Sequence, residues 1–241
     1  MLIRYATIWQ LPRHNNSNTM HRLNILLLLL ALVLFVGCKQ DYYEAGDGEY
    51  SLLTANFVEA HAAAPKTIDY VITDEGERLS LQQPQTVSWA AKADSLYRAV
   101  LYYNFSGGTT VETVSMKKVS VASITPKDSI KQGIKTDAVR LESMWLSKSK
   151  HYLNAAILVK SGDTDDEKVT HTMGIVAIDT LHNTDNTSTL CLQLYHDQGG
   201  VPEYYSQRTY FSIPLQGVAN DSVRLSINTP EGVTTKTFSI Q

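Results

Sequence analysis

The chain has 241 residues, of which 43% are hydrophobic and 19% charged, and its formal net charge is −3. This balance is typical of a globular protein and excludes a largely disordered chain. Residues 1–38 contain three arginines and no acidic residue, so the rest of the chain carries 18 Lys and Arg against 24 Asp and Glu. Without a basic cluster to neutralise phosphates, nucleic acid is not an expected partner.

An apolar run from Leu23 to Val36 dominates the N-terminal segment. Its 14 residues are fewer than the roughly 20 that span a bilayer. This length is typical of the apolar region of a signal peptide. Met20-His21-Arg22 supplies the short basic segment in front of the run, so we expect Met20 to be the true start.

The apolar run ends in Phe35-Val36-Gly37-Cys38. This resembles the lipobox of bacterial lipoproteins, in which a small residue precedes the cysteine that is acylated. Residues 1–38 are therefore predicted to be a signal peptide, with Cys38 as the lipidation site and the membrane as partner through that lipid anchor, since two or more acyl chains attach a protein stably. Lys39, rather than an aspartate, follows Cys38, which favours the outer membrane. The periplasmic face and the cell surface both remain open.

Residues 39–48 are polar and contain glycine, which indicates a short tether. Strand-like runs follow, and Asp74-Glu75-Gly76-Glu77 reads as a hairpin turn between two of them. These runs indicate a small closed barrel over residues 49–135. A polar stretch at residues 127–137 is the expected boundary. The predicted strands are Glu49–Glu59, Thr67–Thr73, Arg78–Leu81, Ser95–Phe105 and Thr109–Ile124, the last being one bulged strand or two.

The C-terminal half contains seven further runs with short polar connections, a pattern that suits a β-sandwich over residues 136–241. Alternation is clear in Val223-Leu225-Ile227, and no long segment has helical period. The predicted fold class is therefore all-β, with an N-terminal OB-like barrel followed by an antiparallel sandwich. The predicted strands are Ala138–Ser147, His151–Lys160, Val169–Thr180, Thr189–His196, Gln207–Leu215, Ser222–Asn228 and Thr234–Ile240.

Several short motifs carry a resemblance to a known family. They are the lipobox, Asp41-Tyr42-Tyr43, the hairpin Ile68–Leu81, Glu142-Ser143-Met144-Trp145 with Tyr152-Leu153-Asn154, and Tyr195-His196-Asp197. Together they resemble the NigD-like lipoproteins of Bacteroidetes over most of the chain that follows Cys38. The resemblance implies an OB-like barrel before a β-sandwich. It implies a link to bacteriocin-associated genes through the family name, and it supplies no catalytic residues.

One loop stands out as a candidate binding site. His196-Asp197 precedes a Gly-Gly-Val-Pro segment that leads to Glu203, Tyr204 and Tyr205. Acidic groups, an imidazole and two phenols on a loop between strands could bind a glycan or a peptide. The alternative interpretation is a strand-end His-Asp pair with tyrosines packed on the rim of the sandwich.

No metal site and no cofactor are expected. The five histidines after Cys38 show no close ligand spacing, although His151 and His171 could face each other on neighbouring strands. The acidic run Asp163–Glu167 fails the EF-hand spacing and reads as a solvated hairpin tip.

Four triplets resemble the O-glycosylation motif of exported Bacteroidetes proteins. Each is an Asp followed by Ser or Thr and then by an apolar residue. Chance supplies about one such triplet in a chain of average composition. The acceptor residues would be Ser95, Ser129, Thr180 and Ser222.

The sequence contains no nucleophile elbow, P-loop or dinucleotide fingerprint. We therefore expect a non-enzymatic envelope protein that binds a glycan or another envelope protein. The alternatives are a cryptic glycan-processing hydrolase acting from the His196–Tyr205 loop, and a bacteriocin-associated immunity or export protein.

Overall fold

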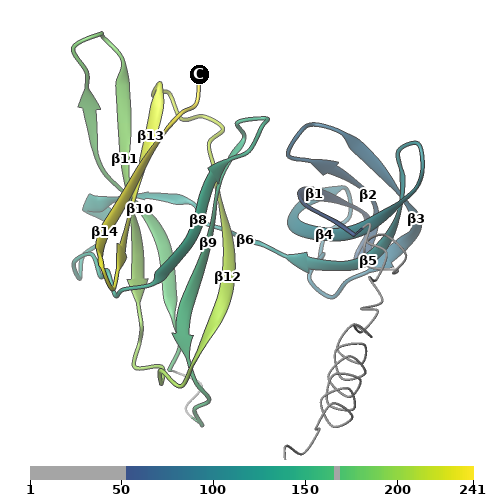
Figure 1. The fold of residues 1–241 in the computed structure, drawn as a ribbon, viewed down its shortest axis with the longest axis horizontal. Helices are drawn as coiled ribbons and strands as arrows, with labels where there is room; N and C mark the ends of the chain where they lie inside the picture. Colours follow the sequence, from purple (N-terminus) through teal and green to yellow (C-terminus); the bar gives the residue numbers. More distant parts are fainter. Residues whose placement is uncertain (1–52, 166–168) are drawn as a thin grey trace, which may run out of the picture. The chain divides into compact units, whose positions relative to one another are not determined.

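The computed structural model describes residues 53–165 and 169–241, which all belong to one compact unit, Leu52–Gln241. Cys38, the predicted start at Met20 and the tether 39–48 lie outside the described residues. The described part consists of fourteen strands and one 3-10 turn (Figure 1), so the predicted all-β class is confirmed. None of its segments forms a helix long and apolar enough to cross a membrane.

Five strands close into a barrel in the order β1-β2-β3-β5-β4. Nine consecutive antiparallel pairs join β1 to β4, whereas β3 and β5 meet in a short parallel contact at Ser80↔Thr110 and Leu81↔Val111. The prediction of a small closed barrel in the N-terminal half is confirmed. The strands are β1 (Thr54–Ala64), β2 (Thr67–Thr73), β3 (Arg78–Thr86), β4 (Ser95–Gly107) and β5 (Thr110–Lys118).

The barrel core follows from alternation along its strands. Every second residue of β1 from Val58 to Ala62 is buried, because successive side chains of a strand point to opposite faces. Leu101 and Tyr103 of β4 contribute larger buried side chains to the same core. The segment between β3 and β4 packs against the same core through Trp89.

The sandwich consists of two sheets. One has five strands in the order β14-β13-β11-β10-β7, and the other has four in the order β6-β12-β9-β8. The long strands are β8 (Arg140–Leu146), β9 (Tyr152–Ser161), β10 (Thr172–His182), β11 (Ser188–Asp197), β12 (Tyr205–Pro214), β13 (Ser222–Thr229) and β14 (Gly232–Ser239). All seven runs predicted for this half are present as strands.

The chain changes from barrel to sandwich earlier than the predicted division at residues 135 and 136. β6 (Ser120–Val121) pairs with β12, and β7 (Ile124–Pro126) pairs with β10, so both belong to the sandwich sheets. The polar stretch 127–137 includes a 3-10 turn, Lys127–Ser129. β6 and β7 have only two and three residues, and strands this short show no alternation of apolar and polar residues in the sequence.

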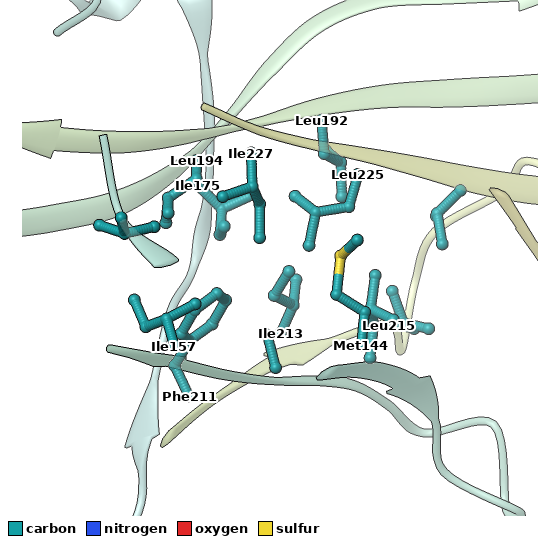
Figure 2. Close-up of a cluster of buried hydrophobic side chains, with 14 of the residues drawn as sticks. Met144, Ile157, Ile175, Leu192, Leu194, Phe211, Ile213, Leu215, Leu225 and Ile227 are labelled. Atoms are coloured by element: carbon teal, nitrogen blue, oxygen red, sulfur yellow. The ribbon is translucent and has the colours of Figure 1, made fainter. Parts of the chain in front are cut away.

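Figure 2 shows the core between the two sheets, where side chains from both inner faces interdigitate. Ile157, Ile213, Leu225 and Ile227 are completely buried. Fully burying one such side chain contributes about 1.5–3 kcal/mol, so this core supplies a large part of the stability of the sandwich.

Candidate binding cleft at the junction of barrel and sandwich

The outer face of the four-stranded sheet carries two polar side chains that are completely buried, Asn154 of β9 and Ser212 of β12. The barrel covers them with Arg98 of β4. Arg98 Nε donates to Ser212 Oγ at 3.0 Å, and Arg98 Nη2 donates to Asn154 Oδ1 at 3.1 Å. Ser212 Oγ in turn donates to Asn154 Oδ1 at 2.7 Å. Barrel and sandwich therefore share one buried hydrogen-bond network.

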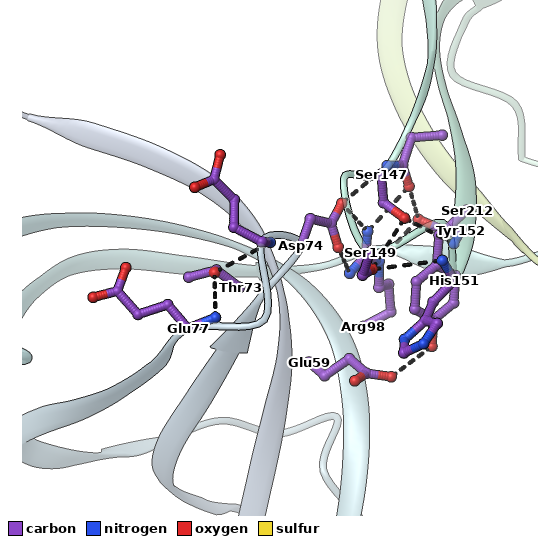
Figure 3. Close-up of polar contacts among 12 residues, drawn as sticks. Glu59, Thr73, Asp74, Glu77, Arg98, Ser147, Ser149, His151, Tyr152 and Ser212 are labelled. Carbon is purple, nitrogen blue, oxygen red and sulfur yellow. Dashed lines mark hydrogen bonds and ion pairs between the residues drawn. The ribbon is translucent and has the colours of Figure 1, made fainter.

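Asp74, in the turn between β2 and β3, neutralises the buried guanidinium (Figure 3). Arg98 donates to both of its carboxylate oxygens, at 2.6 and 2.7 Å, and Asn154 Nδ2 donates to it at 3.1 Å. The backbone N–H of Ser149 donates to the Asp74 carbonyl at 2.8 Å. A buried charge is tolerated only when it is paired and hydrogen-bonded, and this turn meets both conditions.

Tyr152 of β9 completes the junction. The Arg98 guanidinium lies 4.1 Å from its ring centroid, a cation–π distance. The Tyr152 hydroxyl donates to Glu59 Oε1 of β1 at 2.8 Å. Burial, followed by the hydrogen bond to Glu59, raises the pKa of Tyr152 to about 12. The phenol therefore stays protonated as a donor across the whole physiological pH range.

A cleft of about 570 Å³ opens beside this network, with walls from both the barrel and the sandwich. We call it the junction cleft. Phe57 of β1 lies in it, perpendicular to Trp145 of β8 at 5.1 Å and to Tyr210 of β12 at 5.5 Å between ring centroids. The cleft is lined by Ala55, Asn56, Phe57, Asp74, Glu75, Glu142, Ser143, Trp145, Leu146, Ser147, Lys148, Ala156 and Tyr210.

The charged groups around the junction cleft are paired. Glu142, the extra residue of a β-bulge in β8, accepts two hydrogen bonds from Arg208 at 2.6 and 2.7 Å. This hydrogen bonding lowers the pKa of Glu142, and it raises the pKa of Arg208. Lys148 lies 3.4 Å from Glu75. An aromatic floor with a few fixed polar groups is the usual composition of a small-molecule site.

The predicted ligand loop does not assemble as one site. His196 is 1% exposed and points between the sheets, whereas Asp197, the next residue of β11, points to the opposite face and pairs with Lys135 at 2.6 Å. Hydrogen bonding from Lys135 lowers the pKa of Asp197. Glu203 lies in the exposed segment beyond. His196 and Asp197 therefore do not face one common site.

Tyr204 and Tyr205 are 79% and 47% exposed, and the ring of Tyr204 lies beside Gly162, just after β9. The loop is held by close backbone packing at Gly199. A Cβ at this position would lie 2.2 Å from the Thr170 carbonyl oxygen, and its φ is +62°. Only glycine satisfies both conditions without strain.

The suggestion that His151 and His171 face each other is wrong. His171 Nδ1 instead lies 3.1 Å from His196 Nε2, and the two rings are stacked. His196 Nδ1 must donate to the Asp137 carbonyl oxygen at 2.9 Å, since that oxygen can only accept. If His196 carries no second proton, its Nε2 accepts and His171 donates from Nδ1. Burial, and then the neighbouring His196, lower the pKa of His171.

The remaining predicted positions are spread over the fold. Ser129 is exposed in the 3-10 turn, whereas Ser95, Thr180 and Ser222 are half-buried within strands. Asp163 and Asp165, from the acidic run, are exposed. Within residues 53–165 and 169–241, no group of three His, Cys, Asp or Glu side chains is placed to hold a metal ion.

Sequence reasoning missed the residues that make the junction. Trp145 and Asn154 entered only as marks of the family resemblance, and Arg98 and Asp74 entered within a predicted strand and a predicted turn. One signal was available: Asn154 interrupts the apolar run of β9, whose neighbours Leu153 and Ala155 are fully buried. A polar residue at such a position needs a partner.

The fold and the cleft define an all-β protein with a groove where a barrel meets a sandwich. Residues 120–240 match the model of the NigD-like C-terminal beta sandwich domain. This match covers half of the chain, and the chain belongs to the NigD-like family. The search of curated proteins gave no match.

Solved structures share both parts of this architecture. A NigD-like immunity protein from Bacteroides caccae is 25% identical, with a TM-score of 0.59 over 77% of this chain and 91% of its own. Since 77% of the chain is more than residues 120–240 supply, the similarity extends into the barrel.

Two further structures show the same fold. A Bacteroides vulgatus protein of unknown function is 17% identical, with a TM-score of 0.58 over 78% of this chain and 90% of its own. A protein from Bacteroides fragilis that is proposed to be a lipoprotein is 10% identical. Its TM-score is 0.52 over 78% of this chain and 98% of its own.

Proposed function

We propose that this chain is a non-enzymatic binding protein of the cell envelope, anchored to the outer membrane by acylated Cys38, and that it binds its partner in the junction cleft. The observation that carries the proposal is the cleft itself, about 570 Å³ in volume and lined by Phe57, Trp145 and Tyr210. Its volume lies within the range of about 300–1,000 Å³ for ligand sites. Its walls are fixed by the hydrogen bonds of Arg98 to Asp74 and Asn154.

Photo-crosslinking in living cells tests the binding role. A p-benzoylphenylalanine residue would replace Ser143, which is exposed in the cleft, or Thr237, which is exposed on β14 of the other sheet. The proposal expects an adduct from position 143 and none from position 237. Equal adducts from both positions, or none from position 143, would contradict it.

The lipid anchor supports a role at the envelope and has its own test. Membrane fractionation would compare the wild type with Cys38→Ala and with Cys191→Ala, the matched change at the half-buried second cysteine. We expect only Cys38→Ala to leave the membrane fraction. Protease shaving of intact cells, with a periplasmic control protein, then distinguishes the surface from the periplasmic face.

A second candidate function is immunity to a bacteriocin, favoured by the 25% identity to the NigD-like immunity protein of Bacteroides caccae. An immunity protein protects its own producer. Deletion of the gene should therefore make cells sensitive to culture supernatant of the parent strain, and a plasmid copy should restore resistance. A deletion strain that grows normally in that supernatant would remove this candidate.

A further inference from the structure

We infer that the junction cleft binds a neutral oligosaccharide. This inference rests on the proposed function and specifies its ligand. Three features of the cleft carry it: an aromatic floor, charges that already have partners, and planar polar groups with hydrogen-bonding capacity left over.

The aromatic floor provides the apolar contact. Phe57 is perpendicular to both Trp145 and Tyr210, at interplanar angles of 85° and 84°. A perpendicular contact uses the edge of one ring against one face of the other, so it leaves a face of Trp145 and a face of Tyr210 outside the contact. The C–H face of a pyranose ring is a flat apolar surface that suits an aromatic face.

The charges argue for a neutral ligand. The three acidic residues that line the cleft, Asp74, Glu75 and Glu142, are paired with Arg98, Lys148 and Arg208 respectively. An anionic ligand would meet paired carboxylates, and a cationic one would have to compete with arginines already bound at 2.6 Å. Sugar hydroxyl groups require neither charge.

The polar groups have capacity for hydroxyls. An ionised carboxylate offers about four lone-pair sites, and Arg208 uses two of those of Glu142. Asn56 donates one N–H to Tyr103 Oη at 3.4 Å, and its amide has a second N–H and a carbonyl oxygen. Ser143 adds a hydroxyl at the exposed wall. A sugar hydroxyl both donates and accepts, so it matches this mixed set.

A peptide is less well matched. Peptides commonly add to the free edge of a sheet through backbone hydrogen bonds. The cleft includes β8, which is the last strand of its sheet, but Lys236 Nζ donates to the Met144 carbonyl of β8 at 3.0 Å. A lysine over an edge strand blocks pairing there.

Tryptophan fluorescence of the chain purified from membranes, in a detergent without a sugar headgroup, tests the inference. Only Trp89 and Trp145 follow Cys38, so Trp89→Phe leaves Trp145 as reporter and Trp145→Phe leaves Trp89. The titrants would be cellotetraose, mannotetraose, xylotetraose and maltotetraose, with tetragalacturonate as the charged comparison.

We expect at least one neutral tetraose to give a saturable change in the Trp89→Phe variant and none in the Trp145→Phe variant. Arg208→Lys, which cannot hold Glu142 in a bidentate pair, should weaken that binding about tenfold. Arg224→Lys, on the other sheet, should leave it unchanged. No response to any neutral tetraose, or equal binding of tetragalacturonate, would overturn the inference.

The crosslinking experiment separates the two proposals. A protein adduct at position 143, together with no response to the tetraoses, would keep the binding function and refute the oligosaccharide. Absence of any adduct from position 143 would refute the binding function itself.

Discussion

Arg98 and Asp74 form a bidentate ion pair within the barrel, with the arginine side chain 1% exposed and the aspartate side chain 17% exposed. The remaining partners of the pair, Asn154 and Ser212, come from the sandwich. A barrel without its sandwich would lose these two partners, and water would have to replace them on the exposed guanidinium. The pair links the stability of the two parts.

Arg98→Ala should destabilise the whole described unit. Removing one partner of a buried ion pair costs about 3–5 kcal/mol, because the other charge is left buried without compensation. Urea unfolding followed by circular dichroism measures the loss. Arg78→Ala is the control, since Arg78 lies on the barrel surface over the ring of Tyr70, where a cation–π contact contributes about 0.5–1 kcal/mol. Similar losses in both variants would contradict the role assigned to Arg98.

Glu59 and Tyr152 should show coupling across the junction. A double-mutant cycle with Glu59→Gln and Tyr152→Phe measures the free energy of their 2.8 Å hydrogen bond. We expect a coupling of about 1–3 kcal/mol, since one partner is charged. A coupling near zero would mean that the barrel and the sandwich are not held together at this point in solution.

His171 should make the protein less stable in mild acid. Its folded-state pKa is lowered, first by burial and then by His196, so the unfolded chain binds a proton more readily. The contribution of neutral His171 to stability is complete above the pKa of histidine in the unfolded chain, about 6.5. It is lost as the pH falls from there through the lowered pKa of the folded state. Urea unfolding at pH 7.5, 6.5 and 5.5 should show that the free energy of unfolding decreases as the pH falls. His171→Gln should reduce this slope of the free energy against pH.

His182→Gln is the matched control for that experiment, because His182 is exposed at the end of β10. It should retain the slope of the wild type. An unchanged slope in the His171→Gln variant would show that other groups determine the acid sensitivity.

The loop at residues 197–205 provides a test of backbone packing. Gly199 and Gly200 both have positive φ, at +62° and +79°, but only at Gly199 would a Cβ collide with a neighbour, Thr170. Gly200→Ala should cost about 1 kcal/mol for its left-handed backbone. Gly199→Ala should cost clearly more by thermal unfolding. Equal costs would show that the collision with Thr170 is relieved in solution.

Much of the fold could be predicted from the sequence. The turn signal after Thr73 located β2 at its observed bounds. Alternation placed Val223, Leu225 and Ile227 on one face of β13, and all three are fully buried. β1 continues to Ala64, beyond the predicted end at Glu59, because Ala60 and Ala62 pair with β4 and Ala64 pairs with β2, although alanine has low strand propensity. Pairing across the barrel therefore overrides the local preference.

The candidate site could not be predicted in the same way. Arg98 and Ser212 are 114 positions apart in the chain, and Arg98 and Asp74 are 24 apart. Local pattern reads Arg98 as one polar residue in a strand, which is ordinarily exposed. Only the docking of barrel on sandwich buries it. The loop at His196–Tyr205 attracted attention for its composition, but strand alternation sends His196 and Asp197 to opposite faces.

We expect glycosylation of the predicted acceptors to begin at Ser129. This residue is exposed in a turn, whereas Ser95, Thr180 and Ser222 lie half-buried within strands. Intact-mass measurement of the native protein should show added hexose-sized increments, and Ser129→Ala should lose at least one of them. A native mass equal to that of the bare polypeptide would reject the modification.

The most direct measurement for the account as a whole is the mass of the N-terminal peptide of the protein purified from membranes. A lipid-anchored envelope protein predicts that this peptide begins at Cys38 and carries a diacylglyceryl group, alone or with a third acyl chain. A peptide that begins at Met1 or Met20, or that carries Cys38 as a free thiol, would contradict the anchor and with it the proposed place of this protein in the cell.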